Sequence, residues 1–114
     1  MLDDVVRLRH MLDAATEACA YVEGQSKAML LDDTMRTLAM VKCIEILGEA
    51  ATQISEPFKD KHPDLPWQIM KGLRNRLVHA YFDVDISILW ETATHNLPPL
   101  IEQLSILLTA YDPT

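Results

Sequence analysis

The sequence predicts an all-α fold, an up-and-down bundle of four to five helices that forms a single domain over residues 1–114. Hydrophobic residues make up 49% of the chain and aromatic residues only 6%, so the core must be aliphatic and built mostly from good helix formers. Glycine occurs only 3 times, and all 6 prolines lie after position 56. β-Sandwiches and barrels need many turns, so this composition favours helices.

The first predicted helix covers residues 3–23. Asp3 and Asp4 favour its positive N-terminal end, and Gly24 is a suitable stop before a loop over residues 24–31. Apolar residues recur at spacings of three and four, which is the period of a helix with one buried face. These residues are Val5, Leu8, Leu12, Ala15, Cys19 and Val22.

A second long helix is predicted over residues 32–55, with Asp32 or Asp33 as its cap. Apolar residues lie on two of its faces, so it is either central in the domain or also faces a second subunit. Gly48 costs such a helix about 1 kcal/mol relative to alanine. Close approach of another helix would explain why glycine stands at this position.

Residues 56–66 carry three prolines and many charges, which predicts a connection with room for one helical turn. Pro66 suits the first turn of a third helix, because the N–H that proline lacks is not needed there. This helix is predicted to run to about residue 79, and residues 80–85 then break the apolar pattern.

A last helix is predicted over about residues 86–111, with Asp85 as a candidate N-cap. Pro98 and Pro99 interrupt its apolar stripe, so we expect either a kink or two shorter helices. The chain contains no visible internal repeat and no low-complexity tract.

The charge balance and the cysteines narrow the possible functions. A net charge of −7 argues against nonspecific binding of duplex nucleic acid, although it leaves room for a local basic site. Cys19 and Cys43 lie far apart in apolar helical stretches, which predicts buried thiols. No apolar run approaches the roughly 20 residues of a membrane span, and the first residues are acidic, so we expect a cytoplasmic protein without membrane contact.

Basic and titratable residues gather in residues 71–83. Lys71, Arg74 and Arg76 are three of the ten basic residues, and His79 and Tyr81 follow within five positions. An exposed helix face would explain such a cluster as well as an anion site would. Arg74 and His79 are about 140° apart on an unbroken helix, so they converge only if the helix ends near His79 or a second subunit completes the site.

These residue types could cleave RNA without a metal ion. The ribose 2′-OH supplies a nucleophile within the substrate, and His79 could act as general base or acid near neutral pH. Arg74 could hold the scissile phosphate and stabilise the charge that develops on its oxygens. Tyr81 could bond the phosphate or orient the histidine, and Asn75 could position His79 from one turn earlier.

Several motifs stand in a fixed order along the chain. Arg74-x4-His79-x-Tyr81 matches the Arg-x(4–6)-His-x-Tyr signature of HEPN ribonucleases. The surrounding motifs are residues 46–51 (ILGEAA), Pro66-Trp67, residues 74–79 (RNRLVH), residues 81–85 (YFDVD), Trp90 and Leu97-Pro98. Together they resemble the HepT-like branch of the HEPN superfamily over about residues 30–110. The ordered set is far more specific than the short signature alone.

The resemblance implies properties that the apolar periodicity of the sequence does not predict. HepT-like proteins are helical homodimers whose two Arg-His motifs line a shared cleft. Many are ribonuclease toxins encoded beside a minimal nucleotidyltransferase of the MntA type, which can silence the toxin by adenylylating a tyrosine near the motif. This chain has no tyrosine between Arg74 and His79, so Tyr81 is the nearest candidate acceptor. We therefore predict a metal-independent endoribonuclease toxin that acts as a homodimer on RNA.

Other residues are weaker candidates. Glu49 could pair with Arg74 or tune His79, although an ordinary helix carboxylate is the simpler interpretation. Lys71, Arg76 and Arg36 could add phosphate contacts, but Arg36 is more typical of a solvated or salt-bridging arginine. The histidines are not spaced as metal ligands, and no phosphate loop or zinc pattern is present, so we expect no metal and no cofactor.

Two alternatives remain open from the sequence. The same fold could be the noncatalytic partner of a minimal nucleotidyltransferase, with Arg74 and Arg76 holding a nucleotide or RNA. It could also be a dimerisation scaffold without any ligand. Turnover separates these possibilities, because a binding protein shifts RNA in a gel and leaves it intact.

Overall fold

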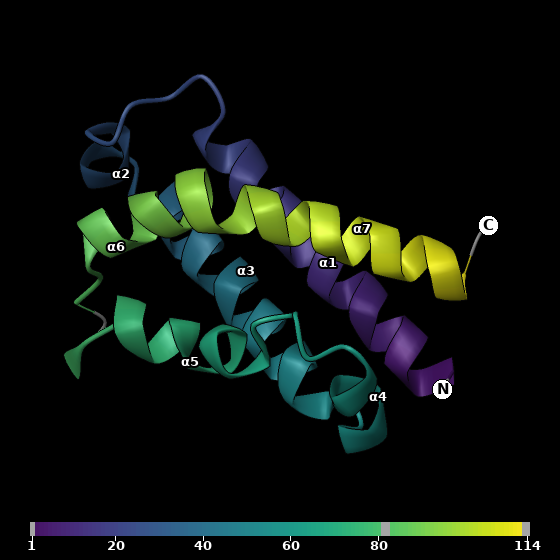
Figure 1. Ribbon diagram of the computed structural model, residues 1–114. Coiled ribbons are helices and arrows are strands. Elements are labelled where there is room, and N and C mark those ends of the chain that lie inside the picture. The colour runs from purple at the N-terminus through teal and green to yellow at the C-terminus, as the bar shows by residue number, and fades with distance from the viewer. Residues whose placement is uncertain (1, 81–82, 113–114) are drawn as a thin grey trace.

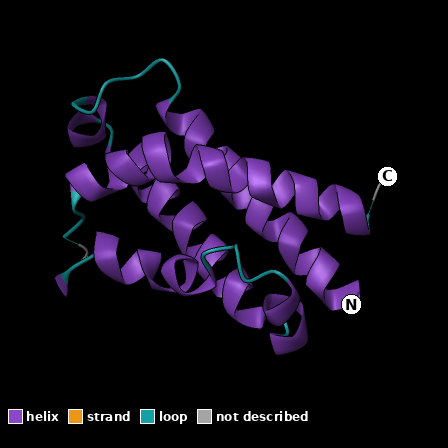
Figure 2. Ribbon diagram, in the orientation of Figure 1, coloured by secondary structure: helices purple, strands orange, loops and turns teal. Residues whose placement is uncertain are grey.

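Helices account for the architecture of the computed structural model, which describes residues 2–80 and 83–112 (Figures 1 and 2). Its long helices are α1 (Leu2–Val22), α3 (Thr34–Gln53), α5 (Trp67–Leu77) and α7 (Leu97–Tyr111). The only β pairing in the described part of the chain is an isolated bridge between Val78 and Val84. The predicted all-α bundle is therefore confirmed. None of the described helices is both long and apolar enough to cross a membrane.

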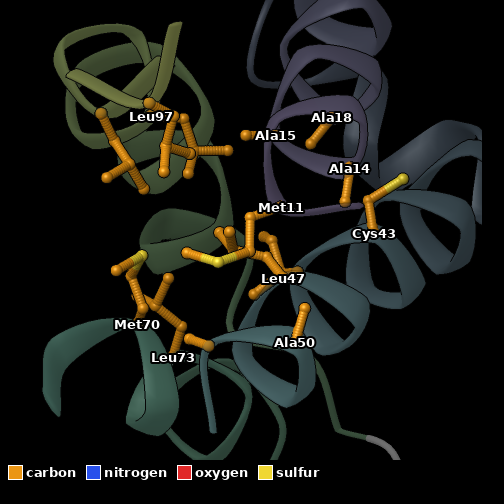
Figure 3. Packing of buried hydrophobic residues seen from close by; sticks show 14 of the residues in the cluster. Met11, Ala14, Ala15, Ala18, Cys43, Leu47, Ala50, Met70, Leu73 and Leu97 are labelled. Atoms are coloured by element: carbon orange, nitrogen blue, oxygen red, sulfur yellow. The ribbon is translucent and has the colours of Figure 1, made fainter. Parts of the chain in front are cut away.

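The antiparallel pair α1 and α3 forms the centre of the bundle. Helix α5 packs against α3, and α7 packs against α1 (Figure 1). Met11 of α1, Leu47 of α3 and Met70 of α5 meet in one aliphatic core (Figure 3). The two apolar faces of the second predicted helix are explained by this position, because α3 lies between two neighbours.

Helices α3 and α5 approach each other closely at Gly48. A Cβ atom added to Gly48 would lie 2.8 Å from the backbone oxygen of Met70, closer than real Cβ atoms come to such an atom. This confirms that close approach of another helix explains the glycine. Glu45, one turn earlier on α3, is thereby brought opposite the last turn of α5.

Two short helices lie in segments that the sequence predicted as connections. Helix α2 (Met29–Asp32) falls largely within the predicted loop 24–31, so that assignment was wrong there. It forms because Leu30 is buried and its carbonyl accepts a hydrogen bond from Thr37 Oγ1 at 2.7 Å. Helix α4 (Glu56–Lys61) is the helical turn that was predicted as an option within the connection 56–66, and Ser55 is its N-cap.

The last predicted helix is divided as expected from its prolines. It consists of α6 (Ile86–Glu91), a π-helical turn (Thr92–Asn96) and α7. Pro98 and Pro99 have no N–H for the carbonyls four residues earlier, and Leu97 donates instead to the carbonyl of Thr92, five residues back. Asp85 is the N-cap of α6, as predicted, because its side chain accepts a hydrogen bond from the Ile88 N–H.

Polar contacts close the bundle at the end where α1 begins and α7 ends. Asp4 is buried and accepts hydrogen bonds from the backbone N–H and hydroxyl of Ser55, at 2.8 and 2.7 Å. Arg9 Nη2 lies 2.9 Å from Asp112 Oδ2. The start of α1 and the end of α7 therefore lie side by side, at the end of the molecule opposite the connection from α5 to α6 (Figure 1).

Candidate functional site

Helix α5 presents its basic residues on the side away from the core. Met70, Leu73 and Leu77 are buried against α3, whereas Lys71, Asn75 and Arg76 are exposed. The Arg74 side chain lies between these extremes and is 40% exposed. The amphipathic period of the helix thus separates the residues that fix α5 from those that could meet a ligand.

The helix ends before His79. Helix α5 stops at Leu77, and Val78 has an extended backbone (φ −120°, ψ 120°). Val78 pairs with Val84, the His79 N–H donates to the carbonyl of Asp83 at 2.9 Å, and the Asp85 N–H donates to the carbonyl of Leu77 at 2.7 Å. The helix thus ends near His79, which was one of the two conditions for bringing Arg74 and His79 together.

Arg74 is held by a carboxylate from the neighbouring helix. Its Nε lies 3.7 Å from Glu45 Oε2, and the other oxygen of Glu45 lies 3.2 Å from Lys42 Nζ. The sequence pointed to Glu49 as a partner of Arg74. Glu49 is exposed and lines a cavity of about 270 Å³ between α1 and α3, together with Arg7 and His10.

Sequence reasoning missed Glu45, although a signal for it was present. Glu45 lies one turn before both Gly48 and Glu49 on α3. Gly48 marks the point where another helix comes close. Glu45, three positions earlier on the same face, is therefore placed to pair with a side chain of that helix. Gly48 therefore accounts both for the close packing of α3 against α5 and for the ion pair between Glu45 and Arg74.

His79 lies on the surface beside Asp85. Its side chain is 56% exposed, and its Nε2 lies 4.0 Å from Asp85 Oδ2. The sequence assigned Asp85 only the role of helix cap, and the structure adds this proximity to His79. An accessible imidazole next to a carboxylate is suited to proton transfer.

Arg36 and Tyr81 are the remaining predicted site residues. Arg36 donates from Nη1 to the backbone oxygen of Tyr21 at 3.0 Å, and its Nε lies 3.3 Å from Asp33. It joins the end of α1 to the start of α3, so its role in RNA binding stays a prediction. The predictions for Tyr81 lie outside the residues that the structure describes.

Comparison with known proteins assigns the family. A model of the ribonuclease HepT-like family matches residues 11–107. The chain belongs to the HepT-like family.

Relatives of this HepT-like chain cover most of its length. A protein of Thermococcus cleftensis, named a probable ribonuclease HepT, is 34% identical over 93 residues, which is 78% of this chain and 84% of the relative. A protein of Caldanaerobacter subterraneus, provisionally named an RNase, is 35% identical over 101 residues, or 89% of this chain and 90% of the relative. Comparison with solved structures gives no significant match.

The thiols of the HepT-like chain do not resemble reactive cysteines. Burial, the hydrogen bond to Glu17 and the negative charge of Glu17 together raise the pKa of Cys43 to about 12. Burial also raises the pKa of Cys19, whose thiol donates to the carbonyl of Ala93. Within residues 2–80 and 83–112, no group of three His, Cys, Asp or Glu side chains is arranged to hold a metal ion.

Proposed function

We propose that this HepT-like protein is a metal-independent endoribonuclease and the toxin of a toxin–antitoxin pair. The observation that carries the proposal is the end of α5 at Leu77, which releases His79 from the helix that bears Arg74. A guanidinium and an accessible imidazole then stand on one short segment of a chain whose relatives are named as ribonucleases.

The chemistry follows from these two groups. The 2′-OH of the substrate attacks the adjacent phosphorus and the bond to the 5′-oxygen breaks, which leaves a 2′,3′-cyclic phosphate and a 5′-hydroxyl. The 2′-OH loses a proton and the leaving 5′-oxygen gains one. His79 transfers the proton at one of these oxygens and water at the other, while Arg74 stabilises the charge that develops on the phosphate. Lys71, Asn75 and Arg76 are exposed on the same helix and supply further contacts to the RNA.

A homodimer with both motifs in one cleft fits the exposed residues of α3. Met35, Leu38 and Ile46 are exposed hydrophobic residues on the helix that carries Glu45. A second copy packed on this stripe would bury them and bring two Arg74 groups close to one substrate. A nucleotidyltransferase of the MntA type is the proposed antitoxin, and Tyr81 is the proposed acceptor of its adenylyl group.

Cleavage of a mixed RNA pool in the presence of EDTA tests the proposal. The wild type should give products with 2′,3′-cyclic phosphate ends. His79→Ala should give no cleavage, and Arg74→Ala should lower the rate roughly 10²- to 10³-fold, the usual loss of one oxyanion donor. His95→Ala is the matched control, because His95 is an exposed histidine outside this segment and its loss should leave the rate unchanged.

The results of this assay distinguish a metal-independent ribonuclease from the alternative functions. Equal cleavage by the wild type and His79→Ala would contradict the assignment of His79. Intact RNA that is nevertheless shifted in a gel by the wild type would favour the noncatalytic partner of a nucleotidyltransferase. Loss of cleavage on addition of EDTA would contradict metal independence.

A further inference from the structure

The short pairing of residues 78–79 with 83–84 determines which side chains accompany His79. Side chains alternate between the two faces of an extended segment, and paired residues share a face. Val78 is buried and Val84 is partly buried, so this pair faces the core. Alternation then places His79, its pairing partner Asp83 and Asp85 on the opposite face, where Oδ2 of Asp85 lies 4.0 Å from Nε2 of His79.

Asp85 offers one carboxylate oxygen to each of two neighbours. Its Oδ1 accepts the Ile88 N–H at 3.0 Å, which caps α6, while Oδ2 lies 4.0 Å from Nε2 of His79. The capping bond fixes the orientation of the carboxylate, because a rotation that moved Oδ2 away would break it. His79 therefore meets a negative charge whose position the start of a helix already determines.

We propose that Asp85 is a positioning residue for His79. Its carboxylate lies beside Nε2, so that the opposite edge of the ring faces away from the carboxylate. A separation of 4.0 Å is longer than a hydrogen bond, so the interaction acts through charge in the free protein. The catalytic part of this proposal rests on the proposed function, whereas the pairing itself does not.

The substitution Asp85→Asn distinguishes the proposed positioning of His79 from the capping of helix α6. Asp85→Asn removes the negative charge but keeps an oxygen that can accept the Ile88 N–H, and asparagine caps helices about as well as aspartate. Asp83→Asn is the matched control, because it removes the same charge from the same segment two residues away. Both variants should unfold within about 2 °C of the wild type.

The first measurement is the imidazole NMR spectrum of protein with ¹⁵N-labelled histidine at pH 6.5. His79→Gln assigns the signal of His79, and His95 beside Glu91 is an internal reference. Asp85→Asn should shift the Nε2 resonance of His79, because it removes the charge that lies 4.0 Å from this nitrogen. Asp83→Asn should shift this resonance less, and neither variant should move the signals of His95.

The second measurement is RNA cleavage by the same proteins. Asp85→Asn should lower kcat roughly tenfold to a hundredfold and leave KM unchanged, whereas Asp83→Asn should keep the rate. An unchanged Nε2 resonance of His79, or an unchanged kcat in an active enzyme, overturns the proposal. A shifted Nε2 resonance in a protein that cleaves no RNA at all leaves the pairing of Asp85 with His79 standing and refutes the proposed function instead.

Discussion

Cys43 couples folding stability to alkaline pH. Its thiol is buried and donates a hydrogen bond to Glu17 at 2.8 Å, and its pKa is raised from 9.0 to about 12. The folded protein therefore holds this proton more tightly than the unfolded chain does. The resulting stability is fully present below about pH 9 and is lost as the pH rises towards about 12.

Exchange of Cys43 for serine tests this coupling. Serine keeps a hydroxyl that can donate to Glu17, but it does not ionise in this range. Between pH 8 and pH 11, the free energy of unfolding of the wild type should fall relative to that of Cys43→Ser, as measured by urea denaturation. Parallel curves for the two proteins across this range would contradict the raised pKa.

The sequence predicted those residues of the candidate site that local charge, spacing and capping patterns identify. Arg74 and His79 stand out from charge, spacing and motif, and Asp85 stands out as a helix cap. Their neighbours depend on tertiary structure, because Glu45 meets Arg74 only across the contact between α3 and α5. Glu49 was an equally reasonable candidate in the sequence, and the rotation of α3 about its axis decides between the two carboxylates.

The contact between α3 and α5 predicts the effect of adding one methyl group. Gly48→Ala should destabilise the protein by about 1–3 kcal/mol, because the backbone oxygen of Met70 cannot move alone to make room. The separation of the helices should also weaken the pairing of Glu45 with Arg74, so RNA cleavage should fall. Urea denaturation and the cleavage assay measure these two effects.

Gly72 on α5 is the matched control for Gly48. A Cβ atom added there meets nothing within 4 Å, so Gly72→Ala should gain up to about 1 kcal/mol from helix propensity alone. Opposite signs for the two substitutions would support the close approach. Equal stabilisation by both would show that α3 and α5 are not in tight contact in solution.

Long helices were predictable from the sequence, and short ones were not. The periodic segments 3–23, 32–55 and 66–79 each correspond to one helix, with ends displaced by one to two residues. Helix α2 has only 4 residues and depends on burial of Leu30 and its bond to Thr37, so local preference gives no sign of it. The division of the last helix was predictable because proline removes specific N–H groups.

The proposed homodimer concerns the whole molecule, and the hydrophobic stripe proposed for it on α3 is extended by Leu31 of α2. Leu31, Met35, Leu38 and Ile46 are exposed there, with Met35 84% accessible. Leu38→Glu would place a charge in the middle of this stripe and should convert a dimer to a monomer. It should also abolish RNA cleavage if each substrate needs two copies of the motif.

Light scattering after size exclusion measures the mass of these variants. Ile106→Glu is the control, because Ile106 is exposed on α7, which packs against α1 rather than α3. This variant should keep the mass and the activity of the wild type. A dimer that persists in Leu38→Glu would move the interface to another face of the molecule.

The arrangement of the two ends of the chain has a practical consequence. Helix α1 begins and α7 ends at the end closed by the Arg9–Asp112 pair, whereas the connection from α5 to α6, which carries His79, lies at the opposite end (Figure 1). An affinity tag, a fluorophore or a surface linker attached at either terminus would extend away from Arg74 and His79. Immobilised protein should therefore still admit a long RNA, so that capture of the RNA and its release after cleavage can be followed on a sensor surface.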